Sequence, residues 1–130
     1  MDIFDISGRA MAAQMTRMNT VASNLANARS VAGNEADAFR ALKPVFRGVT
    51  DGPDRATVDV AQIIQSDTQP RMRHDPANPL ANKDGYVWDA GVDESAELIE
   101  MIETARQYQN NVQVLQTASS LILETVRIGK

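Results

Sequence analysis

The feature that most constrains this chain is a long stretch without glycine or proline, from Asp93 to Ile128. Within it, apolar and small residues recur at alternating intervals of three and four, which is the spacing of a coiled-coil seam. Asp93 or Ser95 can cap its start, and Gly129 follows as a stop. The pattern therefore predicts one long helix. Its seam consists of Leu98, Met101, Ala105, Tyr108, Val112, Leu115, Ser119, Ile122 and Val126.

The length of this helix limits how the chain can fold. About 34 residues at 1.5 Å each give a helix of roughly 50 Å. A compact globule of this chain length has a diameter of only roughly 35–40 Å. The helix would overrun such a globule and expose part of its apolar stripe, and exposed stripes of this kind usually mark protein interfaces. We infer that the helix completes its packing against other subunits.

A second seam with the same spacing lies near the N-terminus. Ser7 or Asp5 is its expected N-cap, and Gly33 is the expected stop after a fraying end. Periodicity leaves two interpretations open, an amphipathic helix packed on its own domain or a seam between molecules. We infer that the two terminal helices pair with each other. The N-terminal seam consists of Phe4, Gly8, Met11, Met15, Met18, Ala22 and Leu25.

The middle of the chain differs in kind, because it holds all five prolines and cannot sustain a helix. Two strands are predicted over Leu42–Val49 and Thr57–Gln65, with a third short one over Tyr86–Trp88. Asp51–Asp54 supplies a turn between the first two, as in a hairpin.

These elements give a mainly α chain with three parts. An N-terminal coiled-coil helix is expected over 1–30 and a C-terminal coiled-coil helix over 92–130. Between them, residues 31–91 form a small extended or β-hairpin segment rich in proline and glycine. The two helices are expected to pair as a coiled-coil hairpin.

Composition excludes most catalytic chemistry. The chain has no cysteine and one histidine, His74, so thiol nucleophiles, disulfides, thiolate zinc sites and most triads are ruled out. No phosphate-binding loop or nucleophile-elbow motif occurs. The glutamates of the C-terminal stretch recur every three residues and are interpreted as a solvated acidic face, because a di-iron site would need histidine partners. These are Glu94, Glu97, Glu100 and Glu103. We expect no catalytic, cofactor-binding or metal site.

The charge balance and the apolar runs limit the partners. A net charge of −4 argues against nucleic acid, which usually meets clustered lysine and arginine. No apolar run approaches the roughly 20 residues of a membrane helix, so no direct membrane insertion is expected. The acidic start lacks the features of a cleaved secretory signal.

Three segments, in order, resemble those of bacterial flagellar rod and hook proteins. Residues Ala22–Ala28 resemble their Asn-Leu-Ala-Asn signature, and Ala105–Val112 resemble the aromatic, Gln and Asn signature of their last helix. Between them, Asn78–Val87 is similar to a stretch of one family, the proximal rod proteins. The resemblance spans nearly the whole chain.

This resemblance implies a structural subunit of the basal-body rod, with no enzymatic activity and no cofactor. It implies paired terminal helices that line an export channel and polymerise into the torque-transmitting shaft for motility. The implied partners are copies of the chain, other proximal and distal rod proteins, and the rod base at the membrane ring and export gate. The implied location is the rod that spans the periplasm, reached through flagellar type III export. The alternative is a related axial protein or an inner-rod or needle-type subunit of a secretion system.

Asparagines near the two seams suggest how the assembly keeps its register. A buried amide can bond across an interface and fix register, whereas the alternative is a solvated side chain. The methionines of the N-terminal seam either adapt to inequivalent neighbours or are ordinary core residues. The assembly interface predicted on these grounds comprises Met11, Met15, Met18, Asn24, Leu25, Asn27, Leu98, Met101, Tyr108, Gln109, Asn110, Val112, Leu115 and Ile122.

Overall fold

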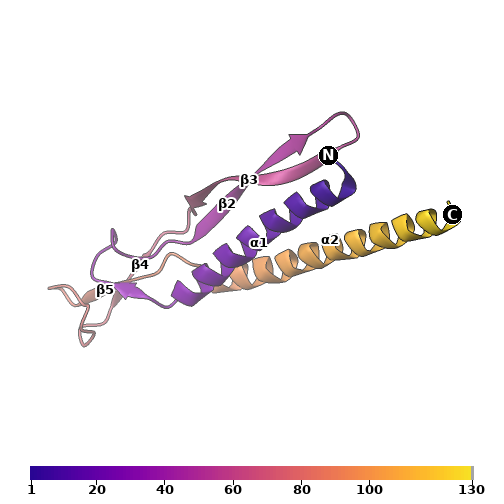
Figure 1. Cartoon of the computed structure of the whole chain (residues 1–130). Helices are drawn as coiled ribbons and strands as arrows, with labels where there is room; N and C mark the ends of the chain where they lie inside the picture. Colours follow the sequence, from indigo (N-terminus) through magenta and orange to yellow (C-terminus); the bar gives the residue numbers. More distant parts are fainter. Residues whose placement is uncertain (130) are drawn as a thin grey trace.

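The computed structural model describes residues 1–129 and is an elongated molecule built along two antiparallel helices (Figure 1). Helix α1 lies between helix α2 and a two-stranded hairpin, and it packs on both. A second, smaller sheet lies at the end where α1 finishes and α2 begins. The elements are α1 (Ile3–Asn27), β1 (Val31–Ala32), β2 (Leu42–Thr50), β3 (Ala56–Gln65), β4 (Arg71–His74), β5 (Tyr86–Asp89) and α2 (Glu94–Ile128).

Helix α2 confirms the long C-terminal helix. Its N-cap is Asp93, whose carboxylate accepts a hydrogen bond from the Ala96 amide, and Gly129 is its C-cap. Acidic residues in the first turn and Arg127 in the last turn suit the helix dipole. Its 35 residues correspond to about 52 Å at 1.5 Å per residue. The helix is therefore longer than a globule of this chain could cover.

Helix α1 confirms the N-terminal helix, but the predicted cap and stop were wrong. The N-cap is Asp2, and Asp5 closes a capping box from the third helical position. Ser7 lies inside the helix and is buried. The helix ends at Asn27 with Ala28 as its C-cap. Gly33 has a different role, because a Cβ there would lie 3.0 Å from the Leu80 carbonyl oxygen.

The predicted hairpin is confirmed as β2 paired antiparallel with β3. Its turn contains Gly52 at φ +91°, a conformation that glycine adopts without strain. The register shifts between Val45 and Phe46, so that Ala61 has no partner on β2. Such a bulge increases the local twist. The hairpin lies along α1, and the Thr57 hydroxyl donates to the Ile6 carbonyl at 2.8 Å.

A second antiparallel sheet has the order β1-β5-β4. Strand β5 confirms the third predicted strand and extends it to Asp89. Strands β1 and β4 were not predicted, because β1 has two residues and the exposed β4 lacks an apolar alternation. Arg73 on β4 bonds Asp89 on β5, and this hydrogen bond raises the pKa of the guanidinium. The prediction of a mainly α chain is thus confirmed in part: two helices are joined by five strands in two sheets.

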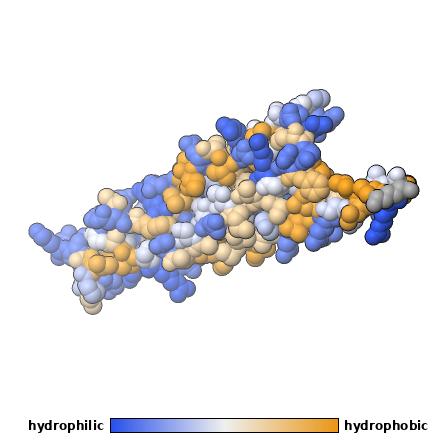
Figure 2. All heavy atoms as spheres, viewed as in Figure 1, coloured by the Kyte–Doolittle hydropathy of each residue, from blue (hydrophilic) through white to orange (hydrophobic). Residues whose placement is uncertain are grey.

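The interior of the protomer is made of small side chains. Most of its buried hydrophobic residues are alanines, and its buried polar residues include three with hydroxyl groups on α1 and α2. The largest apolar side chains lie on the surface, and Figure 2 shows them gathered along the hairpin and the free end of α2. The buried residues are Ala13, Val21, Ala38, Ala41, Val87, Ala90 and Ala118, with Ser7, Thr20, Asn24, Thr57 and Thr104.

Candidate assembly interface

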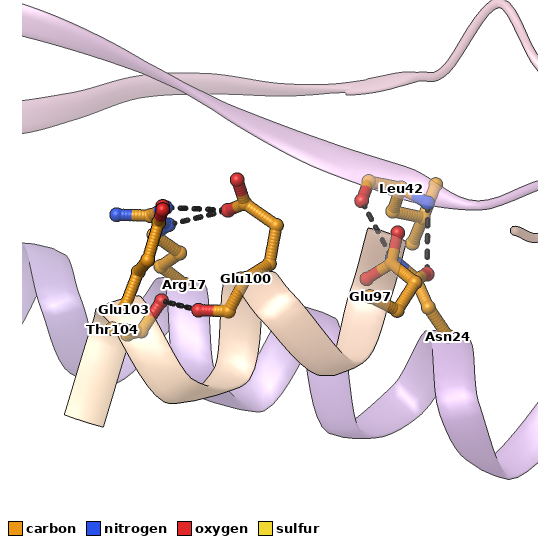
Figure 3. Close-up of polar contacts among 7 residues, drawn as sticks. All are labelled: Arg17, Asn24, Leu42, Glu97, Glu100, Glu103 and Thr104. Carbon is orange, nitrogen blue, oxygen red and sulfur yellow. Dashed lines mark hydrogen bonds and ion pairs between the residues drawn. The ribbon is translucent and has the colours of Figure 1, made fainter. Parts of the chain in front are cut away.

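Asn24 joins three elements where the two helices meet the hairpin (Figure 3). Its side chain is 1% exposed. Its Oδ1 accepts from the Leu42 amide at 2.9 Å, and its Nδ2 donates to the Leu42 carbonyl at 2.9 Å and to Glu97 Oε2 at 3.1 Å. The amide therefore pairs with the first residue of β2 as a neighbouring strand would, and it also holds α2.

Arg17 forms the second polar link between the helices, two turns nearer the start of α1. Its Nε donates to Glu100 Oε2 at 2.8 Å, and its Nη2 lies 3.6 Å from Glu103 Oε2. The Arg17 side chain is only 17% exposed, so its charge is largely removed from water and depends on these carboxylates. We call Arg17, Asn24, Glu97, Glu100 and Glu103, together with the Leu42 backbone, the polar cluster.

The glutamates of α2 refine the interpretation as a solvated acidic face: the Glu94, Glu100 and Glu103 side chains are 43%, 43% and 58% exposed and are also paired. Glu97, Glu100 and Glu103 contact α1, and Glu94 pairs with Arg29 at 3.3 Å. A spacing of three residues keeps side chains along one side of a helix, and here that side lies against α1. Their partners on α1 were not anticipated, because nothing in the local pattern says which helix face a carboxylate meets.

The residues predicted for the interface fall into three groups. Asn24 is buried within the chain, whereas Met15, Leu98, Gln109, Asn110 and Ile122 are exposed. The remaining eight are half-buried: Met11, Met18, Leu25, Asn27, Met101, Tyr108, Val112 and Leu115.

The structure brings four of these predicted residues together across the helix pair. Met15 and Met18 of α1 and Tyr108 and Gln109 of α2 line one cavity of about 160 Å³, completed by Gln14 and Ala105. The Oε1 atom of Gln14 is buried and lacks a hydrogen-bond partner in the part of the chain that is described. The two seams thus meet within one chain over this stretch, with imperfect packing.

The last turns of α2 contain no buried residue among those that the structure describes. Ala118 is the last residue of α2 that is buried, and every described residue after it is exposed. Leu121, Leu123 and Val126 are 59%, 62% and 52% exposed. At about 3.6 residues per turn, the apolar side chains of this end point to several sides. Figure 1 shows it projecting past the start of α1. A helix that is apolar all round is normally buried.

No three histidine, aspartate or glutamate residues within 1–129 are placed to hold a metal ion. His74 lies edge-on to Tyr86, with ring centroids 4.9 Å apart, and is exposed on β4. Over the same residues, neither helix is long and apolar enough to cross a membrane.

Comparison with known proteins matches both ends of the chain to rod proteins. Residues 4–33 match the family model "Flagella basal body rod protein", and residues 83–128 match "Flagellar basal body rod FlgEFG protein C-terminal". The chain is 42% identical to the flagellar basal-body rod protein FlgC of Salmonella typhimurium and 43% identical to that of Yersinia enterocolitica. It is 36% identical to FlgC of Aquifex aeolicus. The alignments cover the whole chain and 98%, 98% and 99% of these relatives.

The family matches identify a structural subunit of the flagellar basal-body rod, not an enzyme, and the long helices, the small interior and the exposed apolar end of α2 fit that class. Within that class, the chain belongs to the FlgC family of proximal rod proteins. The similarity predicted from the three sequence segments is confirmed, and so is the location in the flagellar basal body.

Proposed function

We propose that the chain polymerises through its two terminal helices, which pair as a coiled-coil hairpin and place the free end of α2 between neighbouring subunits. The observation that carries this proposal is the distribution of apolar side chains. Small residues fill the interior, whereas Leu121, Leu123 and Ile128 are 59%, 62% and 86% exposed. Exposed apolar surface of this extent marks a protein interface.

The predicted interface residues supply the remaining contacts in this proposal. The exposed Leu98, Gln109, Asn110 and Ile122 face neighbours, and the half-buried methionines of α1 adapt their packing to them. Asn27 donates to its own helix at the Ser23 carbonyl and offers its Oδ1 to a neighbouring subunit. A contact between two different surfaces that does not close on itself builds a helical rod.

The three-part organisation gives each segment a place in the rod. The helices over 1–30 and 92–130 form the inner layer around the export channel, and residues 31–91 pack outside it. Support comes from the position of the hairpin, which lies on the side of α1 away from α2. The partners in this scheme are copies of the chain, other proximal and distal rod proteins, and the rod base at the membrane ring and export gate. In this scheme the subunit reaches the rod by flagellar type III export.

A charge placed on the free end of α2 tests this proposal. Leu123→Asp puts a carboxylate on a side chain that is 62% exposed in the protomer and buried in the assembly, where an unpaired charge is strongly unfavourable. We expect loss of swimming and of rod assembly, measured in soft agar and in purified basal bodies. Circular dichroism of the free chain should stay unchanged.

Leu123→Met is the matched control, because it keeps the volume and apolar character of the side chain. It should swim normally. Normal swimming of the Leu123→Asp variant, with the protein present in its basal bodies, would contradict the proposal.

A further inference from the structure

The α1–α2 contact has two parts that differ in how strongly they fix the alignment of the helices. Toward the free end, the contact is uncharged: Met15 and Met18 of α1 meet Tyr108 of α2 around one cavity, and Ala118 is buried. From Gln107 to Leu123, α2 carries no charged residue. Sliding one helix along the other by a turn would replace one uncharged side chain of α2 by another. This part of the contact specifies the register only weakly.

The polar cluster responds differently to sliding. Asn24 is held by both backbone groups of Leu42, at 2.9 Å each, so it cannot follow α2. A slide by one turn would separate Glu97 from the Asn24 amide and Glu100 from Arg17. It would leave buried or half-buried polar groups without partners, which is the costliest outcome for such groups. A single buried polar contact is known to set the register of helix pairs.

We propose that Arg17 and Asn24, bonded to Glu97, Glu100 and Glu103, select the register of the antiparallel helix pair. Through the register, they fix how far the apolar end of α2 projects beyond α1. Each turn of sliding would move that end by about 5.4 Å. This goes beyond polymerisation itself, because it concerns the conformation of the single chain before any neighbour is present.

The absence of cysteine makes the register measurable by site-directed spin labelling of the full chain. Nitroxides are attached at Ser23→Cys on α1 and Gln116→Cys on α2, two exposed positions that are widely separated along the helix axis. Pulsed electron paramagnetic resonance then gives their distance distribution. With native Arg17 and Asn24 we expect a single narrow peak, and a broad distribution would overturn the proposal.

Reversal of one charge provides the decisive comparison. Arg17→Glu faces Glu100 and Glu103 with a third carboxylate and should displace the peak by about 5 Å or more, the rise of one helical turn. Adding Glu100→Arg to Arg17→Glu restores an opposite pair and should return the native distance. A cluster that only stabilises the fold would lower the melting temperature and leave the peak in place.

Two further outcomes would overturn the proposal. One is a native distance in the Arg17→Glu variant with an intact circular dichroism spectrum. The other applies if the Arg17→Glu variant does not fold. The proposal is then wrong if the double variant Arg17→Glu/Glu100→Arg folds but does not recover the native distance. Because the measurement uses the free chain, it is independent of whether Leu123 lies in the rod interface.

Discussion

The two ends of α2 differ in the contacts that they make with the rest of the chain. At its start, Glu97 and Glu100 are bonded to buried or nearly buried side chains of α1. At its far end, no described residue beyond Ala118 is buried, and Leu123 is 62% exposed. The start of the helix is therefore anchored to its own chain by polar contacts, although Leu98, Ile99 and Ile102 there are exposed, whereas the described turns after Ala118 hold no buried residue.

This difference follows from the directionality of the two kinds of contact. Polar groups removed from water need partners at fixed distances and angles, which a single folded chain provides reliably. Apolar surface is satisfied by any complementary neighbour. A subunit that must meet several neighbours can therefore make its directional bonds internally and leave apolar surface for assembly.

The largest expected effect tests whether Asn27 belongs to the surface that contacts neighbouring subunits. Asn27→Leu removes an amide at the end of α1 whose Nδ2 donates to the Ser23 carbonyl of its own helix. We expect nearly unchanged helix content but impaired rod assembly, measured by circular dichroism and by soft-agar swimming. Normal motility with normal incorporation into basal bodies would show that Asn27 belongs to the protomer alone.

An intermediate effect contrasts the small interior with the apolar end. Ala13 is 3% exposed between α1 and its neighbours, so Ala13→Leu overpacks the interior and should destabilise the free chain by about 1–3 kcal/mol. Leu123→Ala, at the end of α2, should change the same free energy of unfolding by less than about 0.5 kcal/mol. Urea denaturation measures the free energy of unfolding of both variants. Equal losses of stability would show that the interior and the end of α2 do not differ in this way.

The smallest effect separates the polar cluster from the ion pair beside it. The Arg29 side chain is 90% exposed and pairs with Glu94 at 3.3 Å. Exposed pairs contribute little because water and salt screen them. Arg29→Ala should therefore leave the thermal midpoint of the free chain within experimental error, at low and at high salt. A clear loss of stability at low salt would extend the cluster to this pair.

Local patterns were sufficient for the elements whose signals are local. The absence of glycine and proline after Asp93 predicted α2 to its last residue, and the Asp51–Asp54 turn predicted the hairpin. Predictions of features that depend on contacts between distant segments were wrong or missing. Asp2 rather than Asp5 caps α1, and the short β1 and β4 exist only because β5 lies between them.

The sequence by itself determined the two long helices, the hairpin, the surplus of apolar side chains and the similarity to rod proteins. Periodicity, turn residues and motifs all act over a few residues, so they can be read along the chain. Only the tertiary structure decided that the glutamates of α2 face Arg17 and Asn24, and that Asn24 pairs with Leu42. Those choices depend on which helix faces meet, and the same amphipathic pattern is compatible with several rotations and registers.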